Sequence, residues 1–128
     1  MNILLDTHLL LWTAGRRALL SPQADRLIHD RGNTPWFSSV SLWEVAIKRG
    51  QNRPDFRTEP AVLRAGLLAN GYQELSVTGP HCLAVMQLPD IHRDPFDRML
   101  VAQAQCEGLT LLTADTTVAR YPGPVRLV

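Results

Sequence analysis

Short apolar runs alternate along the chain with segments in which apolar residues recur every three or four positions. The short runs lack the length of a helix and are typical of strands buried on both faces of a sheet. They predict strands at residues 3–5, 36–40, 74–77, 109–113 and 125–128. Because helical segments separate these runs, the pattern predicts a parallel sheet covered by helices on both faces, the α/β class.

Polar residues, prolines and glycines mark where the helices begin and end. We expect Thr7 to cap a first helix, and Ser21 with Pro22 to open a second that ends near residue 30. Ser41 is expected to cap a third helix, with Glu44 at the capping-box position three residues later. Further helices are expected at residues 61–69 and 79–86.

The clearest helix in the sequence covers residues 95–106. Asp94 is its expected cap, Pro95 its first residue and Gly108 its stop. A short helix is expected at residues 117–120, and the irregular residues 50–60 are expected to form a loop.

Length and composition describe one globular domain over residues 1–128. Asp6 interrupts the first apolar run and no basic residue precedes it, which argues against a signal peptide. No apolar run approaches the length that crosses a membrane. Cys82 and Cys106 lie in apolar, helical-looking segments without ligand spacing, so we expect reduced core thiols in a cytoplasmic protein.

The formal net charge is only +1, but twelve of the 13 cationic side chains are arginines and Lys48 is the sole lysine. Arginine binds phosphate through two parallel hydrogen bonds better than lysine does. If several of the 12 acids gather at one site, the rest of the surface becomes basic. Such a distribution suits a phosphodiester substrate.

Four acids from separate parts of the chain are expected to meet. Asp6 and Asp115 follow strands, while Glu44 and Asp97 lie in the first turns of helices, so all four should face the carboxyl edge of the sheet. Each acid alone has a simpler explanation as a helix cap or a first-turn acid. Together they repel one another unless a cation is present, and carboxylates favour Mg²⁺ or Mn²⁺.

A carboxylate-held divalent ion lowers the pKa of bound water and neutralises charge that develops on a phosphoryl group. No Ser–His pair or catalytic cysteine is evident, so water is the expected nucleophile. The reaction class that these residues predict is metal-assisted phosphodiester hydrolysis.

Four motifs, spread over nearly the whole chain, resemble PIN-domain proteins and more closely the VapC toxins of bacterial toxin–antitoxin pairs. They are NILLDTH at residues 2–8, SLWEV at 41–45, HRDPFDRMLVAQA at 92–104 and LLTAD at 111–115. The resemblance implies a three-layer α/β/α fold and a Mg²⁺- or Mn²⁺-dependent ribonuclease. It implies Asp6 and Asp97 as the main metal ligands, Glu44 as a ligand or water-orienting group, and Asp115 as holding a second ion or water.

The resemblance also implies partners. VapC-like toxins cleave RNA, usually form homodimers and are inhibited by a cognate antitoxin whose tail blocks the acidic site. A groove for that tail is expected from residues 9–12, the second helix and residues 50–60.

Five residues near the acids have two interpretations each. Thr7 and Thr113 would hydrogen-bond ligand carboxylates or serve only as caps and strand ends. Asp94 is mainly a helix cap, with a supporting role in the site as the alternative. His92 would contact phosphate or be an exposed loop residue, and Arg98 would contact the RNA backbone or be an ordinary surface arginine.

Other functions fit the sequence less well. A receiver-type signalling domain needs adjacent acids before Asp6 and a lysine after a late strand, and the chain has neither. A haloacid-dehalogenase-like phosphatase needs an acid where His8 stands. The remaining alternative is a catalytically silent PIN-like module that binds RNA or a partner, which a test of metal-dependent RNA cleavage would distinguish.

Overall fold

A single parallel sheet forms the centre of the computed structural model, which describes residues 1–128. Its strand order is β3-β2-β1-β4-β5, so the chain starts in the middle strand. The strands are β1 (Asn2–Leu5), β2 (Thr34–Ser38), β3 (Gln73–Leu75), β4 (Thr110–Thr113) and β5 (Val125–Leu127). The helices are α1 (Thr7–Gly15), α2 (Pro22–His29), α3 (Ser39–Gly50), α4 (Pro60–Ala69), α5 (Gly79–Val85) and α6 (Pro95–Glu107), with 3₁₀ turns η1 (Arg17–Leu19) and η2 (Val118–Arg120).

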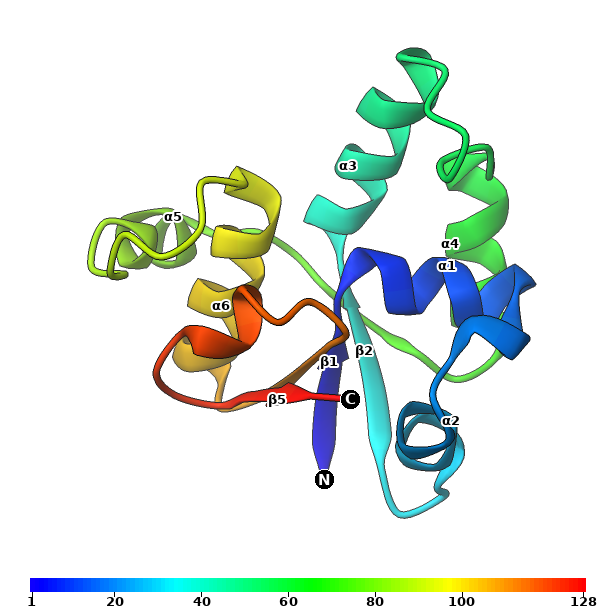
Figure 1. Cartoon of the computed structure of the whole chain (residues 1–128), viewed down its shortest axis with the longest axis horizontal. Coiled ribbons are helices and arrows are strands. Elements are labelled where there is room, and N and C mark those ends of the chain that lie inside the picture. Colours follow the sequence, from blue (N-terminus) through cyan, green and yellow to red (C-terminus); the bar gives the residue numbers. More distant parts are fainter.

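The two faces of the sheet carry separate hydrophobic cores. Successive strand residues point to opposite faces. Ile3 and Leu5 therefore pack with α1, α2 and α4, while Leu4 packs with α6 and η2. Figure 1 shows β1 and β2 between these two groups of helices. The predicted three-layer α/β/α sandwich with short parallel strands is confirmed.

Helix α3 stands at the carboxyl edge of the sheet and bridges the two cores. Figure 1 shows it beyond the ends of β1 and β2, between α6 and α4. Its Val40 belongs to the core under α6, whereas Val45 belongs to the core under α1 and α4. This position brings α3 side chains over the ends of the strands.

Two predicted helix starts are wrong. Asp6, not Thr7, caps α1, because its Oδ1 accepts a hydrogen bond from the Leu9 N–H at 3.0 Å. Ser38, not Ser41, caps α3, so β2 ends two residues earlier than predicted and Glu44 lies in the second turn, outside any capping box. Local sequence does not separate these choices, since aspartate, threonine and serine are all good caps.

The prediction for α6 is confirmed in detail. Asp94 caps it, Pro95 is its first residue, and Gly108 ends it with a φ of 67°, a left-handed conformation that glycine adopts without strain. The prediction of core thiols is wrong, because Cys82 and Cys106 are both exposed and unpaired on the outer sides of α5 and α6. No helix of the structure combines the length and apolar character required to cross a membrane.

Candidate functional site

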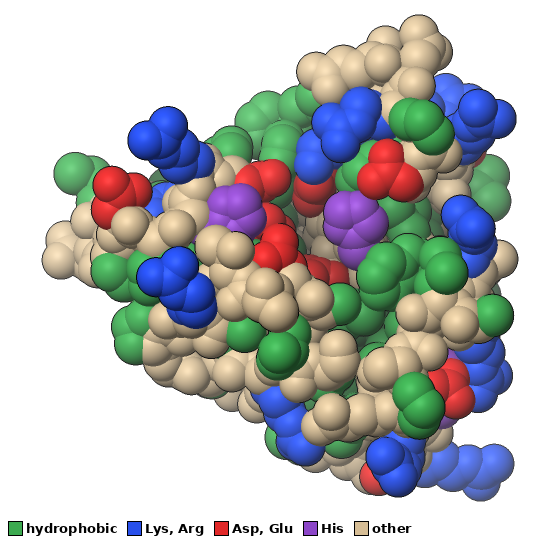
Figure 2. All heavy atoms as spheres, viewed as in Figure 1, with side chains coloured by type: hydrophobic (Ala, Val, Ile, Leu, Met, Phe, Trp, Pro, Cys, Tyr) green, Lys and Arg blue, Asp and Glu red, His purple; other side chains and the backbone are tan.

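The four predicted acids meet in a hollow at the carboxyl edge of the sheet. Asp6 directly follows β1, Asp115 comes two residues after β4, Glu44 lies on α3 and Asp97 lies in the first turn of α6. In Figure 2 the acidic side chains gather in the middle of this face, in a depression between helices. The charges of Asp6, Glu44 and Asp115 all raise the pKa of Asp97, which places the four carboxyl groups in one electrostatic cluster.

Asp6 lies at the bottom of the hollow with 5% of its surface exposed. Its Oδ1 accepts the Leu9 N–H, and its Oδ2 accepts the Thr113 hydroxyl at 2.6 Å. Burial raises the pKa of Asp6, and the two hydrogen bonds oppose that rise. Asp6 is thus both the cap of α1 and a member of the acidic cluster. Its Oδ1 caps the helix, and its Oδ2 is held by Thr113.

Thr113 connects Asp6 with Asp115. Its fully buried hydroxyl donates to Asp6 and accepts the Asp115 N–H at 3.0 Å. Asp115 then uses Oδ1 to accept the backbone N–H groups of Thr117 and Val118, which leaves Oδ2 facing the hollow. The hydrogen-bonding interpretation of Thr113 therefore matches its contacts.

Glu44 is buried, with 3% of its surface exposed, and both of its carboxylate oxygens accept hydrogen bonds. Its Oε1 accepts the Thr7 hydroxyl at 2.6 Å, and Thr7 also contacts the Ser41 hydroxyl at 2.9 Å. Its Oε2 accepts a hydrogen bond from Lys48, one helical turn later. Sequence analysis did not assign Lys48 to the site, although the four-residue spacing of an acid and a lysine on one helix could have identified the pair.

The surroundings of Asp97 strongly disfavour its ionised form. Asp94 positions it by accepting the N–H groups of Phe96 and Asp97 at the start of α6. Burial first, and then the charges of Asp94, Asp6 and their neighbours, raise the pKa of Asp97 to about 8. Neither Asp6 nor Asp97 pairs with a lysine or arginine.

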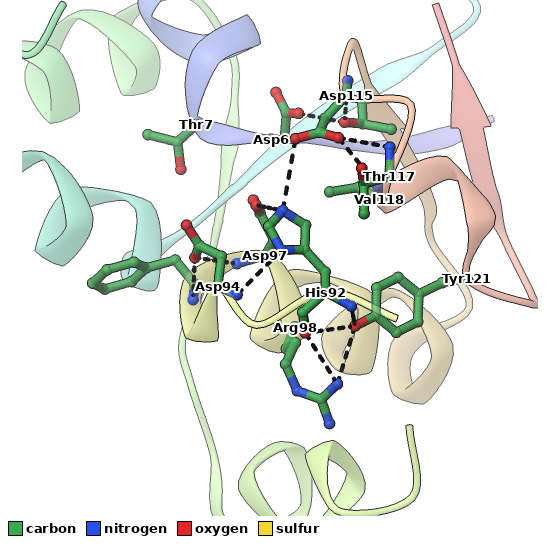
Figure 3. Close-up of polar contacts among 12 residues, drawn as sticks. Asp6, Thr7, His92, Asp94, Asp97, Arg98, Asp115, Thr117, Val118 and Tyr121 are labelled. Carbon is green, nitrogen blue, oxygen red and sulfur yellow. Dashed lines mark hydrogen bonds and ion pairs between the residues drawn. The ribbon is translucent and has the colours of Figure 1, made fainter. Parts of the chain in front are cut away.

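His92 lies beside the acids and is not the freely exposed loop residue that one interpretation predicted. Its Nδ1 accepts the Asp94 N–H at 3.2 Å, so the neutral ring carries its proton on Nε2. Nε2 is 3.3 Å from Asp97 and 3.7 Å from Asp115. In Figure 3 the carboxylates of Asp6, Asp97 and Asp115 lie around one space next to this ring.

The loop that carries His92 is clamped from behind by two residues. The Tyr121 hydroxyl accepts the His92 N–H at 2.9 Å and donates to the His92 carbonyl. Arg98 donates to the Tyr121 hydroxyl and to the carbonyls of Pro89 and Val85. Arg98 thus anchors the loop within the molecule (Figure 3), and contact with an RNA backbone stays a prediction. Tyr121 was not foreseen, because it lies 29 residues from its partner.

The donor set fits a hard divalent cation. His92, Asp97 and Asp115 offer atoms within 4.8 Å of one another. However, Nε2 of His92 bears the proton, and moving it to Nδ1 would break the bond from Asp94. Carboxylate oxygens of Asp6, Asp97 and Asp115 are therefore the available ligands, and Mg²⁺ and Mn²⁺ prefer oxygen. Such an ion would also relieve the repulsion that raises the pKa of Asp97.

Similar proteins share this architecture. The sequence model of the PIN domain matches residues 3–124. VapBC2 from Rickettsia felis, solved bound to a DNA fragment from its promoter, aligns with a TM-score of 0.72, 14% identity and coverage of 100% of this chain and 99% of that one. VapBC from Salmonella typhimurium, bound to DNA, aligns with a TM-score of 0.67 and 18% identity, and the alignment covers 100% of this chain and 97% of that one.

VapC20 from Mycobacterium tuberculosis, a sarcin–ricin loop cleaving toxin, aligns with a TM-score of 0.63 and 17% identity. The alignment covers 93% of this chain and 95% of that one. No curated protein matches the sequence. At these identities the solved structures establish the fold alone. The family match, however, spans nearly all of the sequence, and the chain belongs to the PIN domain family.

Proposed function

We propose that residues 1–128 form a single PIN domain that hydrolyses RNA phosphodiester bonds as a Mg²⁺- or Mn²⁺-dependent endoribonuclease. One observation carries this proposal. Buried Asp6 and partly buried Asp97 lie together at the carboxyl edge of a parallel sheet with raised pKa values and no lysine or arginine partner. Apart from the cap that Asp6 provides to α1, unpaired acids gathered in this way do not stabilise a metal-free fold, whereas they suit a cation site in a ligand-binding crevice.

In this proposal Asp6 and Asp97 hold the cation, Asp115 contributes its free Oδ2, and Glu44 binds it or orients water. A divalent cation bound there lowers the pKa of water and neutralises charge developing on a phosphoryl group. Thr113 and Thr7 fix the orientations of Asp6 and Glu44 through their hydroxyl groups.

His92 has a different role. Its Nε2–H is a hydrogen-bond donor at the rim of the hollow, held in that tautomer by the Asp94 N–H. The Nε2 atom lies 3.3 Å from the Asp97 carboxylate and 3.7 Å from the Asp115 carboxylate, and its hydrogen can be donated to an incoming phosphate oxygen.

We further propose that the chain is the toxin of a toxin–antitoxin pair and is inhibited by its antitoxin. Solved complexes of VapB with VapC support this assignment through their common fold. A hollow lies between α1, α2 and α4, with lining residues that include Thr13, Ile28, Leu67 and Tyr72. Of the groove predicted for the antitoxin tail, only the second helix lines this hollow, through Ile28 and His29, while residues 9–12 and 50–60 do not line it.

For the proposed homodimer, the structure offers an apolar surface on α3 and the α5 region. Trp43, Leu83 and Met86 are 61%, 70% and 79% exposed. Trp43 also lines a largely apolar hollow with Val85 and Met99, and exposed apolar side chains beside such a hollow are typical of protein contacts.

The test is cleavage of labelled single-stranded RNA by purified protein with Mn²⁺. The wild type should cleave, Asp6→Asn and Asp97→Asn should be inactive, and Asp90→Asn, an exposed control, should match the wild type. Loss of activity with an unchanged circular dichroism spectrum supports the enzyme. RNA binding without cleavage by the wild type would instead favour the catalytically silent module.

A further inference from the structure

A second hollow, with the opposite charge, lies beyond the carboxyl end of α3. Three arginines contribute to its wall, and the ring of the fully buried Phe56 closes it from the inside. Asn52 turns the chain there with a φ of 56°, a left-handed conformation that is uncommon outside glycine. The lining residues are Arg49, Asn52, Arg53, Phe56 and Arg57.

No acid of the chain fills this hollow. Arg53 and Arg57 are exposed, and their side chains make no ion pair and donate no hydrogen bond within the protein. Arg49 contacts only the Arg57 carbonyl and, at 3.6 Å, Glu59. Asp55 has its carboxylate 3.1 Å from His8, and that hydrogen bond is the main cause of its lowered pKa. Arg53 and Arg57 therefore present guanidinium groups whose donors are free.

The Lys48 side chain lies between this hollow and the acidic site. The Lys48 amine lies 4.8 Å from the centre of the Phe56 ring, and the His8 ring lies 5.3 Å from it. Lys48 also binds Glu44 of the acidic site. Glu44 and Arg49 are five residues apart on α3, a rise of roughly 7.5 Å along the helix axis. Figure 2 shows Lys and Arg side chains beside the acidic depression on the same face.

We infer that this arginine hollow binds a backbone phosphate of the RNA strand, next to the phosphate that is cleaved. The inference rests on the proposed nuclease function and adds a substrate contact to it. An RNA chain presents a phosphate at every nucleotide, so a strand lying across the acidic site carries a second one within reach of α3. Guanidinium groups bind phosphate in a bidentate manner, and the contact does not depend on base sequence.

The cationic hollow also explains how an acidic site can attract RNA. The carboxylates of the hollow at the sheet edge repel phosphate until a cation binds there, and a nearby cationic group adds attraction along the rest of the strand. Arg53 and Arg57 can supply it because neither forms an ion pair within the protein, although the charge of Arg53 contributes to the lowered pKa of Asp55.

The experiment uses Arg53→Gln and Arg57→Gln, separately and together, in wild type for cleavage and in Asp97→Asn for binding without turnover. Fluorescence anisotropy with a labelled single-stranded RNA gives Kd over a series of salt concentrations. Arg31→Gln is the control, because Arg31 is exposed and precedes β2, at the opposite edge of the sheet. Neither substituted side chain makes an ion pair or donates a hydrogen bond within the protein, so melting temperatures should change little.

We expect the double variant to bind RNA about tenfold more weakly at low salt. The slope of log K against log salt should fall by about 0.7 for the lost phosphate contact. Arg53→Lys with Arg57→Lys should retain the slope, since it keeps the charge. Arg31→Gln should change neither quantity.

The outcomes separate this inference from the nuclease proposal. If wild type cleaves RNA but the double variant keeps the affinity and salt slope of its parent, the arginine hollow is not a phosphate site and the nuclease proposal stands. If wild type binds RNA without cleaving it and the slope still falls in the double variant, the phosphate site stands and the nuclease proposal fails. RNA that is neither bound nor cleaved overturns both.

Discussion

Asp97→Asn should stabilise the metal-free protein at neutral pH, although it removes a central residue of the site. The Asp97 carboxyl is partly buried among other acids, and its pKa is raised from the ordinary 3.8 to about 8. The unfolded chain loses this proton near pH 4, whereas the folded chain keeps it until much higher pH. Ionisation therefore favours the unfolded state as the pH rises.

The pKa difference sets the magnitude and the pH range. The penalty is absent below the unfolded pKa, grows between pH 3.8 and about 8, and is constant above that. At pH 7 it amounts to about 4 kcal/mol. Asparagine has no such penalty, but its buried amide costs about 1–3 kcal/mol where it lacks an acceptor. We therefore expect a net gain of about 1–3 kcal/mol at pH 7.

The assay is urea unfolding with a metal chelator, at about pH 5 and about pH 8.5. The gain from Asp97→Asn should be larger at the higher pH, while Asp90→Asn should have no effect at either. Adding Mn²⁺ should stabilise the wild type and leave Asp97→Asn unchanged. A variant that is destabilised at both pH values, or a gain independent of pH, would refute the argument from a raised pKa.

Two further substitutions test the groups that hold the acids. Thr113→Val removes the hydroxyl that donates to Asp6 and accepts the Asp115 N–H, so we expect a loss of about 1–3 kcal/mol in urea unfolding and about 10- to 100-fold weaker Mn²⁺ binding. Unchanged Mn²⁺ affinity would show that Thr113 does not position Asp6. Lys48→Met leaves the buried Glu44 without its ion-pair partner and should cost about 3 kcal/mol, whereas an unchanged unfolding midpoint would mean that the pair contributes nothing.

The parts of the structure that the sequence predicted well depend on local signals. Asp94, Pro95 and Gly108 define α6 because a cap, a first-turn proline and a left-handed glycine act within one helical turn. The order of strands and helices follows from hydrophobic period alone, so the α/β/α layers were predictable too.

The wrong predictions concern features that depend on contacts between residues distant in the sequence. Ser38 and Ser41 are equally good caps in isolation, but Ser41 is drawn inward to Thr7, which comes from another element, so α3 starts earlier. Cys82 lies in an apolar segment but faces outward on α5, a choice that depends on how α5 packs on α6.

The candidate site shows the same division. That four acids would converge was predictable, because the carboxyl ends of parallel strands meet at one edge. The tautomer of His92 and the clamp by Tyr121 and Arg98 were not, since these contacts join residues that are brought together only by the fold.

Calorimetric titration of Mn²⁺ into the metal-free protein tests the central claim most directly, namely that Asp6 and Asp97 form a divalent cation site. Near pH 7 the Asp97 carboxyl is mostly protonated, since its pKa is about 8. Binding should therefore release about one proton, which buffers of different ionisation enthalpy reveal. We predict saturable binding with this proton release in wild type and neither in Asp97→Asn. Equal binding by both proteins, or no binding by the wild type, would contradict the account.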